Sequence, residues 1–493
     1  MSDVQRSHAR RGLVLAACMM ATFTAAVEIT IVATAMPTIV ADLHGAQLYS
    51  WVFSAYLLTQ AVTIPVYGRL ADLHGRKRVF VAGSAMFLIG SLLCGFSNSM
   101  AMLIVFRALQ GVGAGAVQPI AYTIVGDIYT PVERARIQGM LSGVFGVAAI
   151  VGPSLGAFLV QAVDWRTVFW VNLPVSAAAI AMVIAFLREA REPRHHQIDY
   201  GGTVLLAVAI SAIIFAADRG REIGVLNALI AVAVGIVALG LLLRHERRIE
   251  EPILPLALWR NRIIAIGSLG GFALGATIMS ITAFLPSFIQ GAMGRSAGMA
   301  GGAIGIMTVV WTAGSISAGR LIVYLAYRTI VCAGGAAIVA GALVLASLDS
   351  TSGIVPVVVG ASVLGLGLGF CNTTWVVSVQ TQVSYAQRGA ATSAVLFLRF
   401  LGQAIGAAVA GIVLATAMQH LAPAAADPLG RLLRASGAAA ARTAPMRQLA
   451  AAVGEAFRGI FIMAALLGVA ILALGSQLPR GISASTHAKR AAE

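Results

Sequence analysis

The sequence predicts an all-α membrane protein with fourteen transmembrane helices, arranged as two six-helix bundles with two extra helices between them. Of its 493 residues, 59% are hydrophobic and only 11% are charged, whereas soluble domains carry about 25% charged residues. Apolar stretches of about 20 residues, which is the length that crosses a bilayer, recur along the whole chain. An internal repeat then divides these stretches into two related sets.

The predicted spans are residues 12–38, 48–70, 78–97, 101–128, 136–163, 165–187, 200–218, 223–243, 262–289, 298–325, 328–348, 353–378, 389–417 and 454–475. The first stretch is too long for a signal-peptide core, so we interpret it as a retained helix. The four cysteines all fall inside predicted spans and form no CxxC pair, which argues against a disulfide or a zinc site.

The distribution of basic residues predicts the orientation. Of the 34 Lys and Arg residues, 23 fall in the N-terminal tail, the even-numbered loops and the C-terminal tail, and nine in the opposite loops. The positive-inside rule therefore places both termini in the cytoplasm. The net charge of +15 is then a topology signal facing anionic lipid, and nucleic acid is not expected as a partner.

Two sequence patterns repeat at an offset of about 250 residues. Gly-Arg-Leu at 68–70 reappears at 319–321, and a glycine-rich run at 111–115 reappears at 365–369. Such repeats are typical of secondary transporters, in which the substrate site lies between the repeats. One six-helix unit needs only about 190 residues, so the two helices within 200–243 are the insertion.

These patterns predict three parts. An N-terminal bundle covers residues 1–190, two linker helices cover 191–250, and a C-terminal bundle covers 251–493 with an extracytoplasmic loop at 418–453. Of the 34 basic residues 32 are arginine, and alanine is abundant. This bias suggests a bacterium with G+C-rich DNA, so the expected location is the inner membrane.

Glu28 is the only acidic residue that lies deep in a predicted span. The other 18 Asp and Glu residues fall in loops, tails or helix ends. A charge at the membrane centre costs at least ~2.5 kcal/mol on insertion scales, so acids there usually serve a function. We expect Glu28 to exchange a proton or to contact substrate. A structural hydrogen bond between helices is the alternative.

Several motifs together resemble the major facilitator superfamily. "GRLADLHGRKR" at 68–78 resembles its motif A, "RALQGVGAG" from Arg107 its motif B, and "VGPSLGA" at 151–157 its motif C. "VEITIVATAMP", "WRTVFWVNLP" and "FLRFLGQAIG" are similar to segments of its fourteen-helix drug:proton antiporters. The sequence differs from the pattern where Glu28 replaces an Asp, Ala157 replaces a second Gly, and Val323 stands in the second copy of motif A.

The resemblance implies that Glu28 and Arg107 lie on adjoining helices, and their expected depths are similar. Burial favours the neutral acid and a nearby arginine favours the carboxylate. Approach and departure of Arg107 would therefore drive proton uptake and release. A purely structural Arg107 is the competing hypothesis.

For motif A the resemblance implies a gate. Asp72, Arg76 and Asp127 would form a cytoplasmic charge cluster that latches the two halves in the outward-open state, and an acid there can also cap a helix from the other half. Gly68 and Gly75 permit close packing and a tight turn.

In the antiporter motif, Gly152, Pro153 and Gly156 let a helix bend and pack closely. Close helix packing and a seal against proton leak are both compatible with this pattern.

Arg399 lies near mid-depth in a half of the chain whose spans hold no acid. Asn372 is a candidate partner, together with Gln380 and Gln403, and contact with an anionic group of a substrate is the alternative. Trp375 is a candidate lining residue of an apolar cavity.

We therefore expect a proton-coupled multidrug antiporter that exports amphiphilic, cationic compounds by alternating access. It would act as a monomer, with small molecules, protons and membrane lipid as its partners. The proton gradient would supply energy and no cofactor is expected. Export of a specific metabolite, lipid or organic anion is the runner-up, and a non-transporting scaffold is a third possibility. An enzyme is disfavoured because no nucleotide-binding loop, metal cluster or nucleophile constellation is present.

Overall fold

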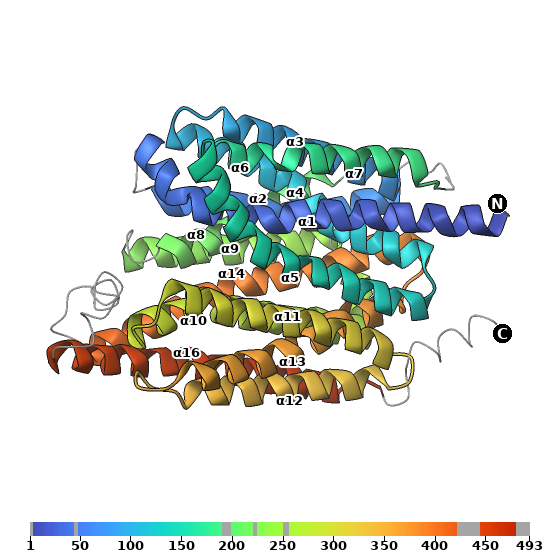
Figure 1. Ribbon diagram of the computed structural model, residues 1–493. Coiled ribbons are helices and arrows are strands. Elements are labelled where there is room, and N and C mark those ends of the chain that lie inside the picture. Colours follow the sequence, from blue (N-terminus) through green and yellow to red (C-terminus); the bar gives the residue numbers. More distant parts are fainter. Residues whose placement is uncertain are drawn as a thin grey trace. The chain divides into compact units, whose positions relative to one another are not determined.

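The structure is a computed structural model that describes residues 3–43, 48–189, 199–219, 224–249, 256–421 and 444–479 (Figure 1). These residues form helices joined by short connections, and no β-strand occurs among them. The prediction of an all-helical protein is thus confirmed for the described part of the chain.

The first half contains α1 (Asp3–Leu43), α2 (Tyr49–His74), α3 (Arg76–Gly95), α4 (Met100–Ile128), α5 (Pro131–Ala162), α6 (Thr167–Trp170), α7 (Asn172–Phe186), α8 (Tyr200–Arg219) and α9 (Val225–Glu246). The second half contains α10 (Arg262–Ser287), α11 (Ala297–Leu321), α12 (Tyr327–Ala346), α13 (Ile354–Gln380), α14 (Arg388–Leu421) and α16 (Ala444–Ser476). Short segments that are not α-helical are η2 (Leu256–Arg260), η3 (Phe288–Ala292) and η4 (Tyr385–Gln387).

Each of the fourteen predicted spans coincides with one of these helices, with one difference. The predicted span 165–187 is two helices, α6 and α7, separated at Val171. In the described residues eleven helices are long and apolar enough to cross a membrane. The chain is therefore a multi-pass protein, and the count of fourteen crossings stays a prediction.

The last helix begins ten residues before the predicted span, at Ala444 instead of residue 454. Its first turns are rich in alanine, which has the highest helix propensity. Residues 444–453 belonged to the predicted loop 418–453, and this part of the loop prediction is wrong. The segment 422–443 lies outside the described residues.

Side-chain caps fix the starts of two helices that carry site residues. At the start of α4, Ser99 Oγ accepts a hydrogen bond from the amide of Met102 at 3.2 Å. At the start of α5, Thr130 Oγ1 accepts from the amide of Glu133 at 3.4 Å, and Glu133 Oε2 accepts from the amide of Thr130 at 3.0 Å. Such caps satisfy backbone N–H groups that have no partner inside the helix. They define where α4 and α5 begin.

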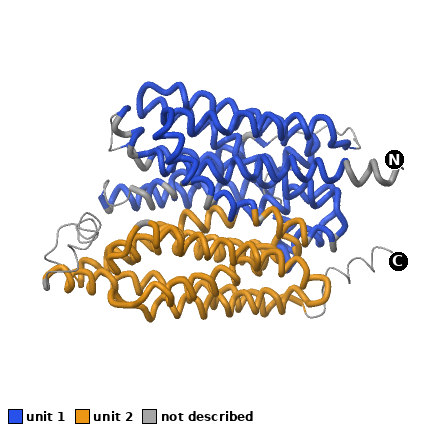
Figure 2. The backbone as a smooth tube through the Cα atoms, viewed as in Figure 1, with its two compact units in different colours: residues 1–134, 144–265, 379–397 blue, residues 135–143, 266–378, 398–493 orange. Residues whose placement is uncertain are grey.

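The chain divides into two compact units (Figure 2). Unit 1 comprises residues 1–134, 144–265 and 379–397, and unit 2 comprises 135–143, 266–378 and 398–493. Two helices therefore contribute to both units: α5 gives its early turns to unit 2, and α14 gives its first turns to unit 1. These two helices occupy corresponding positions in the sequence repeat. The predicted domain boundaries near residues 190 and 250 stay a prediction.

The same helix pairing occurs in each unit. In unit 1, α4 packs against α2 and α3, and α7 packs against α1 and α3. In unit 2, α12 packs against α16, which is the pair that corresponds to α3 and α7 in the repeat. Helices α8 and α9 pack on each other, and α8 also contacts α2, where the rings of Trp51 and Phe215 lie 6.1 Å apart.

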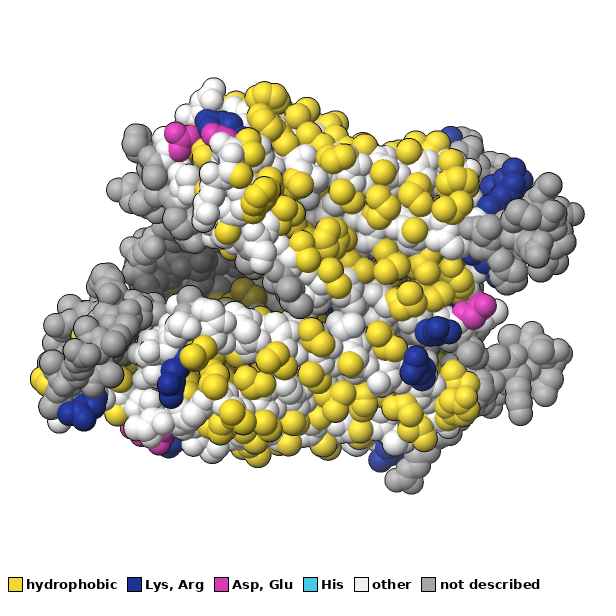
Figure 3. All heavy atoms as spheres, viewed as in Figure 1, with side chains coloured by type: hydrophobic (Ala, Val, Ile, Leu, Met, Phe, Trp, Pro, Cys, Tyr) yellow, Lys and Arg dark blue, Asp and Glu magenta, His cyan; other side chains and the backbone are white. Residues whose placement is uncertain are grey.

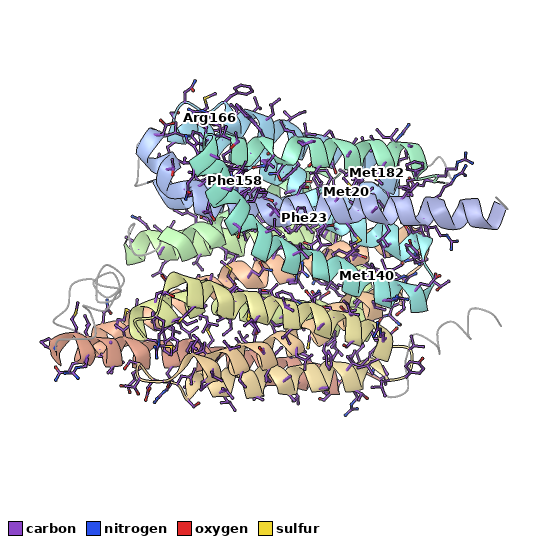
Figure 4. All side chains as sticks on the ribbon, in the orientation of Figure 1. Met20, Phe23, Met140, Phe158, Arg166 and Met182 are labelled. Atoms are coloured by element: carbon purple, nitrogen blue, oxygen red, sulfur yellow. The ribbon has the colours of Figure 1, made fainter. Side chains whose placement is uncertain are left out.

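The surface has the distribution expected of a membrane protein. On the face in Figure 3 the hydrophobic side chains cover the flanks of the helices, and charged side chains gather near the helix ends. Met140 and Phe158 on α5, labelled in Figure 4, are 38% and 63% exposed. Met20 and Met182, labelled in the same figure, instead pack against a buried cluster of unit 1. Large exposed apolar side chains are stable here because lipid covers them.

Candidate functional site

The acid of α1 and the arginine of α4 form a buried ion pair. Arg107 Nη1 lies 2.7 Å from Glu28 Oε1, and both side chains have no exposed surface. The two predicted depths were therefore compatible with contact, and the structure brings the two charges together. A buried pair of this kind needs further hydrogen bonds, because the attraction alone rarely repays the loss of hydration.

Arg107 has three further contacts in unit 1. Its Nη1 also donates to Gln110 Oε1 at 2.7 Å, and its Nε donates to the carbonyl of Val52 at 3.1 Å. Its guanidinium lies 4.2 Å from the centre of the Tyr56 ring, within the range of a cation–π contact. The positive charge therefore has partners other than Glu28.

The second oxygen of the carboxylate also has a partner. Asn172, the first residue of α7, donates its Nδ2 to Glu28 Oε2. Glu28 of α1 is thus held by side chains from both α4 and α7. Sequence reasoning did not identify Asn172 or Gln110, because neutral amides are common in membrane helices and carry no charge signal.

Donors near the pair lack protein acceptors within the described residues. Tyr56 Oη, Arg107 Nη2 and Gln110 Nε2 are all buried and have no hydrogen-bond partner there. Buried donors are usually satisfied, so each is a place where a water or a polar ligand could bind. The surroundings of Glu28 can therefore accommodate a further acceptor.

The motif A residues form a second charge cluster in unit 1. Arg76 Nη2 lies 2.9 Å from Asp72 Oδ1, and Arg76 Nε lies 2.9 Å from Asp127 Oδ2. The three side chains are at most 8% exposed. The grouping that the resemblance implied is therefore present in the structure.

Asp72 caps the start of α14. Its Oδ1 accepts from the amide of Gly389 at 3.0 Å, and its Oδ2 accepts from the amide of Ala390 at 2.7 Å. A carboxylate is favoured at a helix N-terminus because unpaired N–H groups and the helix dipole both attract it. The helix that Asp72 caps belongs to the second sequence half, as the sequence predicted for an acid of this motif.

Three residues complete the cluster, and the sequence did not predict them. Arg388 pairs with Asp127 and donates to the carbonyl of Gly126 at 2.9 Å. The Tyr385 ring lies 4.0 Å from the Arg76 guanidinium, and its carbonyl accepts from Arg76 Nη2. Glu189 Oε1 accepts from the Tyr385 hydroxyl at 3.2 Å. The sequence gave no signal for them, since each lies in a segment that looks like an ordinary loop.

The glycines of motif A allow these contacts. A Cβ at Gly68 would lie 2.2 Å from Ser393 Oγ, so any larger residue would push α14 away. Gly75 has φ +91°, a backbone conformation that favours glycine. Beyond Gly75 the carboxylate of Glu189 accepts from the amide of Arg76 at 2.8 Å and so caps α3.

The antiporter-motif glycines pack α5 against α1. A Cβ at Gly152 would lie 1.9 Å from Thr30 Oγ1, and one at Gly156 would lie 3.0 Å from the carbonyl of Ile31. Thr30 Oγ1 donates to the carbonyl of Val27 and, at 3.4 Å, to that of Ala148 on α5. Pro153 is part of α5, and its side chain lies outside the described residues.

In unit 2, Arg399 of α14 and Asn372 of α13 are in contact. Arg399 Nη1 donates to Asn372 Oδ1 at 2.7 Å, and the two residues are 7% and 4% exposed. Trp375 is also buried and packs against Gly270 of α10, where a Cβ would lie 2.4 Å from the indole. Asn372 is thus one of the partners that the sequence proposed for Arg399.

The part of the chain that the structure describes contains no group of three or more His, Cys, Asp or Glu residues placed to hold a metal ion.

The model of the Major Facilitator Superfamily matches residues 18–407 of the chain. Multidrug resistance protein 3 of Bacillus subtilis (strain 168) is 34% identical over 394 residues, which cover 79% of this chain and 76% of that protein. The chain belongs to the Major Facilitator Superfamily. The multidrug transporter protein MdtP of the same bacterium is 32% identical over 411 residues, covering 82% of this chain and 75% of that protein.

The fold agrees with this membership of the Major Facilitator Superfamily. The solved structure of the proton:xylose symporter XylE superimposes with a TM-score of 0.65 and 11% sequence identity, and the match covers 98% of this chain and 99% of that one. Proteins of the superfamily are transporters and not enzymes, so the prediction that this chain is not an enzyme is confirmed. Small-molecule transport is consistent with the relatives named above.

Proposed function

We propose that the chain is a fourteen-helix drug:proton antiporter that exports amphiphilic compounds by alternating access. The observation that carries the proposal is the buried pair of Glu28 and Arg107. The relatives named multidrug resistance protein 3 and multidrug transporter support the substrate class. The proton gradient would supply the energy, without a cofactor.

The contacts of Arg107 explain how a proton could bind and leave. Protonation of Glu28 would cancel its negative charge and weaken the contact with Arg107 Nη1. The guanidinium would keep Gln110, the Val52 carbonyl and the Tyr56 ring as partners. Since Arg107 is compensated in both states, the cost of breaking the pair is lower than for an isolated buried pair. The pair can then alternate between protonated and ionised states.

The motif A cluster is proposed to act as a gate. Asp72 and Asp127 together contact Arg76, Arg388 and the first amides of α14. Opening on that side would require these buried, charge-assisted bonds to break together, so the cluster would favour one conformation. The antiporter-motif glycines would keep α5 close to α1 beside the proton site.

The orientation and assembly follow from the sequence. Both termini would face the cytoplasm of a bacterial inner membrane, and the protein would act as a monomer. Glu28 would favour cationic amphiphiles, because it is the only acid deep in the predicted spans.

A second candidate is export of an organic anion or of a specific metabolite or lipid. The observation that favours it is Arg399, a cation 7% exposed whose described contact is the amide of Asn372. An anionic group of a substrate would bind there by charge-assisted hydrogen bonds. A non-transporting scaffold would show no substrate-dependent ion flux at all.

The test uses proteoliposomes with an imposed pH gradient and a lumenal pH-sensitive dye. Ethidium is the cationic probe, and a fluorescent carboxylate dye is the anionic one. We expect ethidium to dissipate the gradient in wild-type vesicles. Dissipation by the carboxylate alone would favour the second candidate, and no dissipation with a broad compound panel would favour a scaffold.

A further inference from the structure

A cavity of about 710 Å³ lies where α3 begins and α7 ends, within unit 1. Its polar lining contains three cations, Lys77, Arg78 and Arg188, and a single acid, Glu189. Both helices are candidate membrane spans that end at this level. The cavity therefore opens at the membrane surface and carries a net positive charge.

Two of the four polar side chains are already engaged in the cavity wall. Lys77 Nζ donates to the carbonyls of Ile184 at 2.6 Å and Leu187 at 3.0 Å, which ties the end of α7 to α3. Glu189 accepts from the amides of Arg76 and Lys77 at 2.8 and 3.3 Å. These bonds hold the walls in place, and they use the carboxylate that could otherwise neutralise the arginines.

The two arginines are available to a ligand. Arg78 and Arg188 are both exposed, and within the described residues neither forms an ion pair or a side-chain hydrogen bond. An arginine fork matches the oxygens of a phosphate group better than an ammonium does. The positions of these side chains thus favour a phosphate-bearing anion.

The remaining lining is apolar. Val81 of α3, Ile184 of α7 and Leu187 line the same cavity, and Ile184 is 51% exposed. A free phosphate ion gains nothing from such a wall, whereas an acyl chain gains by covering it. A basic pocket between membrane helices on the cytoplasmic side is a site at which anionic lipid headgroups bind.

We propose that this cavity binds one anionic phospholipid of the surrounding leaflet. Its phosphate would lie between Arg78 and Arg188, and its acyl chain would follow Val81 and Ile184 along the groove between α3 and α7. The site is separate from the Glu28 pair, and it would hold lipid whether or not the protein couples transport to protons.

The experiment is native mass spectrometry of the purified full chain with phosphatidylglycerol as the probe. We expect the variant Arg78→Gln/Arg188→Gln to raise the dissociation constant about 25-fold, because each basic residue near a membrane surface contributes about fivefold, or ~1 kcal/mol. Arg328→Gln is the matched control, since Arg328 lies in the first turn of α12, which corresponds to α3 in the repeat. It should bind phosphatidylglycerol as the wild type does.

Three comparisons make the result decisive. The variant Arg78→Lys/Arg188→Lys keeps both charges and should retain most of the binding, which separates charge from a folding defect. Phosphatidylcholine should bind weakly to all variants. Equal phosphatidylglycerol binding by the Gln variant and the wild type would overturn the proposal. Displacement of the lipid by millimolar inorganic phosphate would also overturn it, because the site would then take the free anion.

Discussion

Arg107 of α4 donates to Glu28 of α1 over 2.7 Å, with both side chains entirely buried in unit 1. Breaking a buried pair by removing one partner is strongly unfavourable, because the other charge is left without compensation. This relationship gives the first prediction, which separates the stability role of the pair from its role in transport.

Arg107→Ala should destabilise the protein by about 3–5 kcal/mol, because the Glu28 carboxylate would stay buried without its counter-charge. Arg107→Ala/Glu28→Gln should recover a large part of that loss, since it removes the uncompensated charge. Thermal unfolding in detergent measures both. A double variant that is less stable than Arg107→Ala would show that Arg107 acts through other contacts.

Asn172→Ala should move the pH dependence of transport toward higher pH by about one unit. Asn172 donates to the Glu28 carboxylate, and a hydrogen bond to a charged group contributes about 1.5–3 kcal/mol. Without this donor the protonated acid persists to higher pH. Transport rates measured across pH 5–9 check the shift. Asn98→Ala is the control, because Asn98 is exposed between α3 and α4. A uniform loss of rate without a shift would indicate a structural role only.

Gly68→Ala should slow transport at least tenfold, because the added methyl group would collide with Ser393 Oγ at 2.2 Å and Ser393 Cβ at 2.4 Å. Removing the obstacle in Gly68→Ala/Ser393→Gly should restore part of the rate. Gly240→Ala should have no effect, since a Cβ there meets nothing within 4 Å. Rates of dye efflux from cells check all three. If the Ser393→Gly change gave no rescue, close approach of α14 at Gly68 would not be the reason for the glycine.

Gly152→Ala should destabilise the protein by about 1–3 kcal/mol, the usual cost of overpacking. Its Cβ would lie 1.9 Å from Thr30 Oγ1. Thr30→Ala in the same chain should recover part of the stability, because it removes that oxygen. Unfolding midpoints of the purified proteins give the comparison, with Gly305→Ala as the unhindered control. Equal midpoints for Gly152→Ala and the wild type would contradict close packing of α5 on α1.

Much of the fold was predictable, because hydropathy alone locates membrane helices. All fourteen predicted stretches lie on helices, and only the break at Val171 and the early start at Ala444 differ. A span with a two-part helix has the same average hydropathy as a continuous one. The residues shared between units by α5 and α14 depend on tertiary contacts, and no sequence pattern indicated them.

The candidate site was predictable where charge stands out against an apolar background. Glu28 and Arg107 were identified in this way, and a comparison of their depths anticipated their contact. Asn172 was missed because an amide partner is defined by geometry. The same holds for Glu189 and Arg388, which look like ordinary loop or topology charges until the fold places them beside motif A.

The most direct test of proton coupling is the substrate-dependent proton flux of Glu28→Gln in proteoliposomes with an imposed pH gradient. Glutamine keeps the size of the side chain and its hydrogen bonding but cannot exchange a proton. Glu455→Gln, at an exposed acid on α16, is the matched control. We expect ethidium to drive proton flux in the wild type and in Glu455→Gln, and flux at the background level in Glu28→Gln. Wild-type flux in Glu28→Gln would contradict the assignment of Glu28 as the proton-coupling residue.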